Sequence, residues 1–197
     1  MARNMQPILK RCRTLGIEPA VMGVHKSSNK NPGKGRKKQS EYGLQLNEKQ
    51  KVKFIYGVLE KQFRKYYVLA TKKHGITGEE LLSILETRLD NVVFRLGLAN
   101  TRREARQIVN HGHILVNGKK VDIPSYLIKA GDVIALREKS KASQRMKDIA
   151  EANASRAVPK WLDMNKDTSE GKVIALPTRE DIDYEVEEHL IVELYSK

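Results

Sequence analysis

The sequence has one cysteine, Cys12, among its 197 residues. A lone thiol cannot form an intramolecular disulfide, which favours a reducing compartment such as the cytosol. No apolar run approaches the ~20 residues that cross a bilayer, and the opening MARNMQPILKRCRTLG lacks the apolar stretch of a secretory signal. We therefore expect a cytoplasmic protein that is neither secreted nor membrane-spanning.

Aromatic residues are also scarce, at 6% of the chain, which argues against a platform that stacks single-stranded bases. Acidic residues are outnumbered: 24 stand against 37 lysines and arginines, and the formal net charge is +13. Such an excess attracts a polyanion, most often nucleic acid and second an anionic membrane. A chain of this length with 40% hydrophobic residues can still bury a core, in one domain or two small ones.

The charge is divided unevenly along the chain. Residues 161–197 contain ten acidic and four basic residues, so the positive excess lies entirely in the first 160. A polyanion should meet the front of the chain and be repelled by its end. The acidic end is either a solvated segment or a docking face for a basic protein.

Glycine, proline, asparagine, serine and basic residues dominate residues 1–45 without a sustained period. The stretch from His25 to Gly43 is typical of an irregular basic loop, with too few apolar residues for a core. It is either a disordered tail or an extension that becomes ordered on nucleic acid.

Two later stretches repeat apolar residues at helical spacing. The first opens with a capping-box form at Asn47, and one apolar stripe follows over residues 52–70 with basic residues opposite. The second opens with a capping box at Thr77 and continues, as one or two helices, to Leu96, where Gly97 can end it.

The stretch TRREARQIVNHGHILVNGKKV, residues 101–121, combines a helix with a hairpin. It opens with Thr-x-x-Glu, another capping box, and Gly112 can end the helix. Asn117-Gly118 between two β-prone runs predicts a hairpin, because a type I′ turn needs positive φ at both central residues. A third strand is expected over residues 132–138. Together these predict two helices on a small antiparallel sheet.

Three arginines in the first turns of this helix oppose its dipole, since cations are unfavourable at a helix N-terminus. A departure from the helix-dipole preference that brings no local stabilisation points to function. The N-terminal end of a helix can also bind a phosphate. We therefore predict a phosphate-binding surface rather than a merely soluble face. It comprises Arg102, Arg103, Arg106, Lys119 and Lys120.

These residues also carry a resemblance. RLDNVVFRLGLANTRREARQIVNHGHILVNGKKVDIPSYLIKAGDVIAL, residues 88–136, resembles the alpha-L RNA-binding module of ribosomal proteins, pseudouridine synthases, tyrosyl-tRNA synthetases and a heat-shock RNA-binding protein. The flanks at residues 42–67 and 188–197, the opening MAR and VPKWL near Trp161 are similar to bacterial small-subunit ribosomal protein four. The resemblance covers nearly the whole chain.

The resemblance implies a non-enzymatic, mostly helical α+β fold, in which a helical ribosomal-RNA-binding domain is interrupted by the alpha-L module. The expected boundaries are residues 1–45 for the basic extension, 46–87 with 139–197 for the helical domain, and 88–138 for the module. It also implies direct binding to the 5′ domain of small-subunit ribosomal RNA, nucleation of subunit assembly, and contact with a neighbouring ribosomal protein that influences translational accuracy. We expect no membrane and no small-molecule substrate.

The residues expected to act follow from both arguments. Arg36, Lys37 and Lys38 occupy the stretch that lies near the messenger-RNA path in the family. The expected RNA-binding residues are Arg3, Arg11, Arg13, Arg36, Lys37, Lys38, Lys49, Lys51, Lys53, Arg64, Lys65, Arg102, Arg103, Arg106, His111, Asn117, Lys119 and Lys120. The expected protein-partner face is Glu187, Glu188, Leu190, Glu193 and Tyr195.

Many members of that family bind zinc through an N-terminal cysteine cluster, which Cys12 alone cannot provide, so we expect no zinc and no other cofactor. His111-Gly112-His113 lacks local partners for a metal. Arg88-Leu89-Asp90 is similar to the tripeptide of pseudouridine synthases that holds a catalytic aspartate. Two alternatives therefore stand beside the ribosomal interpretation: an RNA-modifying enzyme and a stand-alone RNA-binding stress factor.

Overall fold

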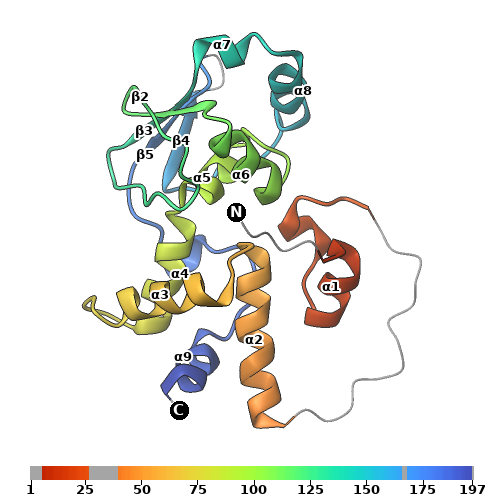
Figure 1. Ribbon diagram of the computed structural model, residues 1–197, viewed down its shortest axis with the longest axis vertical. Coiled ribbons are helices and arrows are strands. Elements are labelled where there is room, and N and C mark those ends of the chain that lie inside the picture. Colours follow the sequence, from red (N-terminus) through yellow and green to blue (C-terminus); the bar gives the residue numbers. More distant parts are fainter. Residues whose placement is uncertain (1–5, 27–39, 166–167, 197) are drawn as a thin grey trace. The chain divides into compact units, whose positions relative to one another are not determined.

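The computed structural model describes residues 6–26, 40–165 and 168–196 (Figure 1). The chain forms two compact units: unit 1 is Met1–Leu81 with Asp183–Lys197, and unit 2 is Leu82–Ile182. Within the described ranges, the helices are all too short or too polar to span a membrane. Each unit is built around its own buried side chains.

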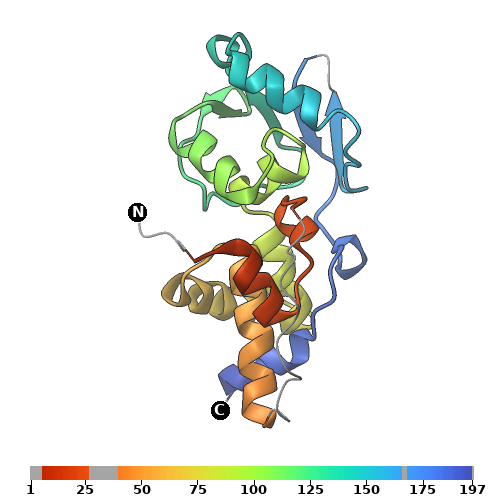
Figure 2. The same ribbon diagram turned by 90° about the vertical axis from the view of Figure 1, so that its right-hand side faces the viewer.

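Unit 1 combines the N-terminal part of the chain with its last helix. Figures 1 and 2 both show the last helix lying along the long helix that precedes the module. Phe63, Ile191 and Tyr56 are almost fully buried in this unit. Its elements are α1 (Ile8–Leu15), the 3₁₀ helix η1 (Pro19–Met22), α2 (Glu41–Ile55), α3 (Glu60–Ala70), the first part of α4 (Thr77–Glu86) and α9 (Glu188–Ser196).

The helix predicted from Asn47 differs from the observed one at both ends. It begins at Glu41, because Ser40 caps it: the backbone N–H of Gly43 donates to Ser40 Oγ at 3.2 Å. The predicted single stripe is broken into α2 and α3, and Gly57 in the break has a φ of 61°. The helical spacing of apolar residues therefore continued across a glycine turn, although two separate helices lie on either side of it.

The expectation of an irregular N-terminal extension is wrong for residues 8–22. There α1 buries Cys12 and Leu15, and Gly16 ends the helix with a φ of 68°. Most of the predicted loop, including residues 27–39, lies outside the described residues.

Unit 2 is an antiparallel sheet with helices packed on it. The strand order is β2-β1-β3-β5-β4. Its helices and strands are the end of α4, α5 (Leu89–Arg95), α6 (Arg102–Asn110), β1 (Ile114–Val116), β2 (Lys119–Lys120), β3 (Val133–Leu136), α7 (Glu138–Lys141), α8 (Gln144–Ala152), β4 (Leu162–Asn165), β5 (Glu170–Val173) and the 3₁₀ helix η2 (Arg179–Asp181).

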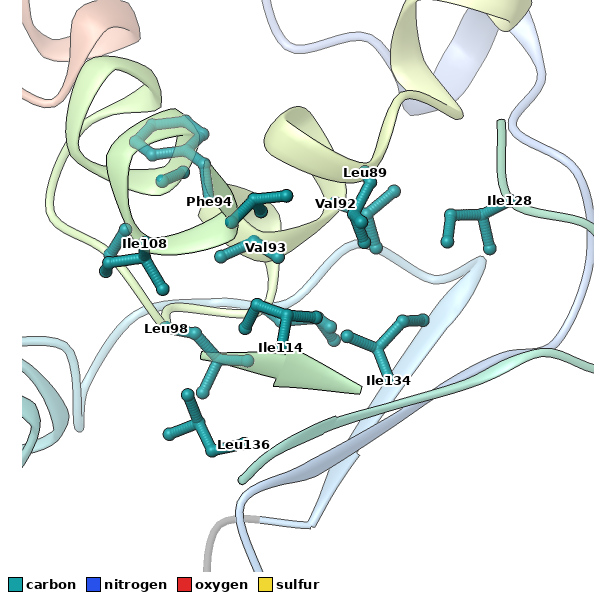
Figure 3. Packing of buried hydrophobic residues seen from close by; sticks show 14 of the residues in the cluster. Leu89, Val92, Val93, Phe94, Leu98, Ile108, Ile114, Ile128, Ile134 and Leu136 are labelled. Carbon is teal, nitrogen blue, oxygen red and sulfur yellow. The ribbon is translucent and has the colours of Figure 1, made fainter. Parts of the chain in front are cut away.

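The core of unit 2 lies between α5, α6 and the sheet. Figure 3 shows Val93 of α5 and Ile108 of α6 on the side facing Ile114 of β1, with Ile134 of β3 beside it. All four side chains are buried. Burying an aliphatic side chain contributes about 1.5–3 kcal/mol, so this packing fixes how α6 is presented.

The local predictions for this unit are largely confirmed. The Thr101 side chain accepts from the backbone N–H of Glu104 at 3.1 Å, so Thr101 caps α6. Asn117 and Gly118 have φ values of 50° and 76°, as a type I′ turn requires. Gly97 follows the end of α5 with a φ of 78°. The α+β class is also confirmed.

The units divide differently from the expected domains. Residues 139–182 were expected in the helical domain, whereas they belong to unit 2. The reason is strand pairing: β5 lies antiparallel to β3, with Ile134 opposite Gly171, and β4 pairs with β5. Neither β4 nor β5 was predicted, because each has four residues and half of those are polar.

Candidate nucleic-acid interface

Asp90 holds two arginines inside unit 2. Its carboxylate accepts from Arg88 at 3.0 Å (Nε–Oδ1) and 2.8 Å (Nη2–Oδ2), and from Arg106 at 2.9 Å (Nε–Oδ2) and 2.6 Å (Nη2–Oδ2). The Asp90 side chain is only 4% exposed. We call Arg88, Asp90 and Arg106 the Asp90 cluster. Such charge-assisted, two-pronged contacts fix a guanidinium firmly.

A second buried carboxylate, Glu86, continues this arrangement. It accepts from Asn91 Nδ2 at 2.6 Å and from Arg95 at 3.1 Å (Nε) and 2.9 Å (Nη2). Asn91 Oδ1 in turn accepts from Arg102 Nε at 2.7 Å, and the Arg102 guanidinium lies 4.4 Å from the centroid of the Phe94 ring. Arg102 is therefore fastened to α5.

Two of the three arginines predicted to bind phosphate thus face inward. Arg102 is 5% exposed, and the side chain of Arg106 is 13% exposed. Their positive charge at the start of α6 is explained by Asn91, Phe94 and Asp90 in the fold itself. The sequence pattern did not contain this information, because the partners lie on α5.

The outward face of α6 is a separate surface. Arg103, Gln107, Asn110 and His111 are exposed there. The first three lie at the i, i+4, i+7 spacing of one helix face. Gln107 was missed as a candidate, although its position four residues after Arg103 could have indicated it.

The hairpin extends this face. Lys119 and Lys120 are exposed, and a Cβ atom on Gly112 would overlap the Cε atom of Lys120. Gly112 also has a φ of 69°, so its missing side chain both ends α6 and makes room for Lys120. We call Arg103, Gln107, Asn110, His111, Lys119 and Lys120 the α6–hairpin surface.

Asn117, which was predicted to bind RNA, and His113, which was not, mainly hold the hairpin and its neighbours. Asn117 Nδ2 donates to Asp132 Oδ1 at 2.8 Å, and the N–H of Val133 donates to Asn117 Oδ1 at 2.9 Å. His113, whose Nδ1 is 2.9 Å from Ser140 Oγ, lies behind His111, with ring centroids 6.0 Å apart. Burial, together with the charges of His111 and Arg137, lowers the pKa of His113.

The lysines predicted on α2 are engaged by acids within unit 1. Lys49 and Lys53 donate to Glu60 at 3.2 Å and 2.5 Å, and the Tyr195 hydroxyl donates to the same carboxylate at 2.6 Å. We call these four residues the Glu60 cluster. Burial alone would raise the pKa of Glu60, but hydrogen bonds from Lys53, Tyr195 and Lys49 outweigh it and lower the pKa to about 2.

The remaining candidates of unit 1 lie in varied surroundings. Lys51 forms an ion pair with Glu48 at 2.8 Å and donates to the Glu185 carbonyl at 3.3 Å. Arg64 and Lys65 are exposed on α3. On α1, Arg13 is exposed and Arg11 is half-buried, while Arg3, Arg36, Lys37 and Lys38 lie outside the described residues.

The expected partner face on α9 is partly turned inward. Glu193 Oε2 accepts from Gln45 Nε2 at 2.9 Å, and the Tyr195 ring packs tilted against Tyr67 with centroids 4.7 Å apart. Glu188 lies over Gly78, where a Cβ would come within 2.7 Å of its Cγ. Leu190 is half-buried, and Glu187 is exposed.

Comparison with known proteins matches both parts of the chain. Residues 3–86 match the family described as ribosomal protein S4/S9 N-terminal domain, and residues 87–134 match the S4 domain. The chain is 60% identical to small ribosomal subunit protein uS4 of Agathobacter rectalis and 59% identical to that of Lachnospira eligens, in both cases over the whole of each chain. It belongs to the bacterial uS4 family.

Membership in the uS4 family makes this chain a constituent of the small subunit of the cytoplasmic ribosome, where ribosomal RNA and other ribosomal proteins surround it, and not an enzyme. The aspartate of Arg88-Leu89-Asp90 agrees with this, since it is buried between two arginines and open to no substrate. Among the residues that the structure describes, histidine, cysteine and acidic side chains nowhere gather in a group of three that could hold a metal ion.

Proposed function

We propose that this uS4 family member binds the 5′ domain of small-subunit ribosomal RNA directly, and that this contact nucleates assembly of the subunit. The observation that carries the proposal is the division of labour on α6. Arg102 and Arg106 are held inward by Asn91 and Asp90, whereas the cations of the α6–hairpin surface are exposed.

The binding mechanism follows from charge and shape. Lysine and arginine side chains neutralise phosphates and release counterions, so affinity falls steeply as salt rises. A folded RNA junction offers phosphates and 2′-hydroxyls in a fixed arrangement, which a rigid surface can recognise with little base readout. The buried core under α6 supplies that rigidity.

Unit 1 contributes a second set of cations in this proposal. Arg64 and Lys65 are exposed and can reach RNA as they are. Lys49, Lys51 and Lys53 have side chains that are 13%, 15% and 14% exposed, and each must first leave Glu60 or Glu48 before a phosphate can replace that carboxylate. Arg11 and Arg13 of α1 also belong to the proposed set.

A binding titration tests the proposal. The RNA is the folded 5′ domain of small-subunit ribosomal RNA, the competitor carries a scrambled junction, and salt is varied. We expect tight, salt-sensitive binding that strongly prefers the intact junction. Equal affinity for both RNAs would overturn the proposed specificity and leave only general attraction to RNA.

Two further contacts belong to the proposal. The exposed residues at the start of α9, together with Glu187 just before it, dock a basic neighbouring ribosomal protein and through it influence translational accuracy. The stretch around Arg36, Lys37 and Lys38 lies near the path by which messenger RNA enters the ribosome. Crosslinking from Lys37 to messenger RNA in assembled subunits tests the second contact, and its absence would refute it.

Removing α9 is a poor test of docking, because Ile191 is fully buried and its loss would damage unit 1. Glu187→Lys reverses an exposed charge instead. We expect weaker co-purification with basic small-subunit proteins and altered misreading in a translation assay. His189→Gln, at an exposed position two residues later, in α9, is the matched control. Equal effects of both variants would argue against a charge-specific face.

A further inference from the structure

Unit 2 contains a cavity of about 220 Å³ that lies apart from the α6–hairpin surface. Its walls come from the turn after α5, from β3 and β4, and from α8 with the residues that follow it. Leu98, Leu136, Met146 and Met164 give it a largely apolar lining. An engineered apolar cavity of roughly 150 Å³ is enough to admit benzene, so this one has room for a larger flat ring.

Cations are part of the same lining. Lys141, Lys147 and Arg156 line the cavity, and no acidic residue does so among the residues described. Lys147 is exposed. Lys141 is paired with Glu138 at 2.7 Å, and the side chain of Glu138 is 86% exposed, so solvent weakens that pair. The cavity therefore suits a ligand with an apolar, flat part and an attached anion.

Polar groups for recognition are also present. Asn153 lines the cavity, and its Nδ2 donates to Asn100 Oδ1 at 2.8 Å and to the Ile149 carbonyl at 2.9 Å. These two bonds fix the amide in place. A held amide beside apolar walls is the kind of group that orients a ring by its edge.

The cavity also adjoins the helix that presents the RNA surface. Arg145 of α8 forms an ion pair with Glu104 of α6, and Glu104 follows Arg103 directly. Asn153 binds Asn100, which precedes α6. The element that walls the cavity is thus fastened to the start of α6, so an RNA strand on α6 is within reach of α8.

We propose that this cavity receives one unpaired base of the bound RNA, with the neighbouring phosphates on Lys147 and Lys141. The inference rests on the proposed function and deepens it. Unstacked bases of RNA loops and bulges are commonly recognised by insertion against protein side chains with contacts to their edges. The RNA thereby gains a base-specific contact that the α6–hairpin surface does not provide.

The test uses two alanines of the full-length chain. Ala150 lines the cavity and is exposed, whereas Ala152, two residues later on α8, is exposed and does not line it. Ala150→Leu should fill the cavity, and Ala152→Leu is the matched control. Ala154→Leu fills the cavity from a second lining position, so it shows whether an effect of Ala150→Leu comes from filling the cavity or from a local change in the fold. Unfolding curves verify that each variant folds.

Each variant is bound to the 5′ domain RNA, and unpaired bases are probed at their Watson–Crick edges with dimethyl sulfate and a carbodiimide. The wild type and Ala152→Leu should protect at least one unpaired base that Ala150→Leu and Ala154→Leu leave reactive. Affinity of the two filling variants should fall measurably below that of the wild type and of Ala152→Leu, because the base loses its contacts in the cavity.

The outcomes separate the two proposals. If the filling variants keep every protection and the wild-type affinity, the base-binding cavity is refuted while RNA binding stands. The base-binding cavity is also refuted if the filling variants bind the RNA normally but no longer join a neighbouring ribosomal protein in the subunit. That result would mean that a side chain of the neighbouring protein occupies the cavity. If the wild type itself does not bind this RNA, both the proposed function and the cavity's role are overturned.

Discussion

In the Asp90 cluster of unit 2 and in the Glu60 cluster of unit 1, a single carboxylate accepts hydrogen bonds from basic side chains. The two carboxylates differ in burial. The Asp90 side chain is 4% exposed, and that of Glu60 is 46% exposed. A buried carboxylate cannot be lost without stranding its arginines in the interior. Glu60 is screened by water, which weakens its ion pairs, although Lys49 and Lys53 are themselves only 13% and 14% exposed.

The comparison teaches that clustered basic residues in a sequence do not by themselves mark a binding surface. Arg102 and Arg103 are adjacent, and one stacks on Phe94 while the other is exposed. The carboxylates that separate the two roles lie on other elements. Burial of the partner decides whether a cation serves the fold or remains for a ligand.

Removing the buried carboxylate should have the largest effect. Asp90→Ala leaves Arg88 and Arg106 without their anion, and breaking a buried ion pair costs about 3–5 kcal/mol. Trp161, the one tryptophan of the chain, is buried in unit 2 and reports its unfolding in urea. Asp122→Ala, which removes an exposed carboxylate of the same unit, is the control and should change stability by under about 0.5 kcal/mol. Similar losses for both variants would remove the basis of the comparison.

Adding a methyl group at the end of α6 should have an intermediate effect. Gly112→Ala forces a non-glycine residue to a φ of 69° and displaces the Lys120 side chain. The backbone strain costs about 1–3 kcal/mol, and the hairpin cation moves, so RNA affinity should fall as well. Gly118→Ala is the control, because its φ is 76° and open space surrounds it. Gly118→Ala should lose stability without displacing Lys120. Equal loss of RNA affinity in the two variants would therefore contradict the role of Lys120.

Removing the exposed carboxylate should have the smallest effect. Glu60→Gln should cost less than about 1 kcal/mol, since water screens this cluster. The pKa of Glu60 is lowered from 4.5 to about 2, so its stabilisation is present above about pH 4.5 and is lost as pH falls towards 2. Hydrogen exchange of α9 amides, which Tyr195 ties to Glu60, measures it. The gap between wild type and variant should close over that pH range, and a gap that widens on acidification would contradict the account.

Local chemistry made much of unit 2 predictable. Thr101 caps the helix that follows it, and the Asn117-Gly118 and Gly97 turns depend on local backbone φ values, so capping and turn rules were sufficient. Strand β5 depends on pairing with β3, far along the chain, and β4 depends on pairing with β5, which a four-residue pattern does not reveal. The inward direction of Arg106 likewise depends on Asp90, sixteen positions earlier.

The same limit applied in unit 1. The basic character of Lys49 and Lys53 was visible in the sequence, whereas their shared partner Glu60 is on the next helix. The glycine break at Gly57 was hidden because the apolar period continued across it. Contacts between separate helices and strands, and in unit 1 the turn at Gly57, were the missing information rather than residue type.

The most direct measurement compares two adjacent arginines in the RNA titration across salt concentrations. Arg103→Ala should keep the wild-type urea midpoint, lose roughly 5- to 100-fold in affinity, and reduce the salt slope by about one. Arg102→Ala should lower the urea midpoint while its folded fraction keeps the wild-type salt slope. A reduced slope for Arg102→Ala together with an unchanged slope for Arg103→Ala would contradict the division between inner and outer arginines.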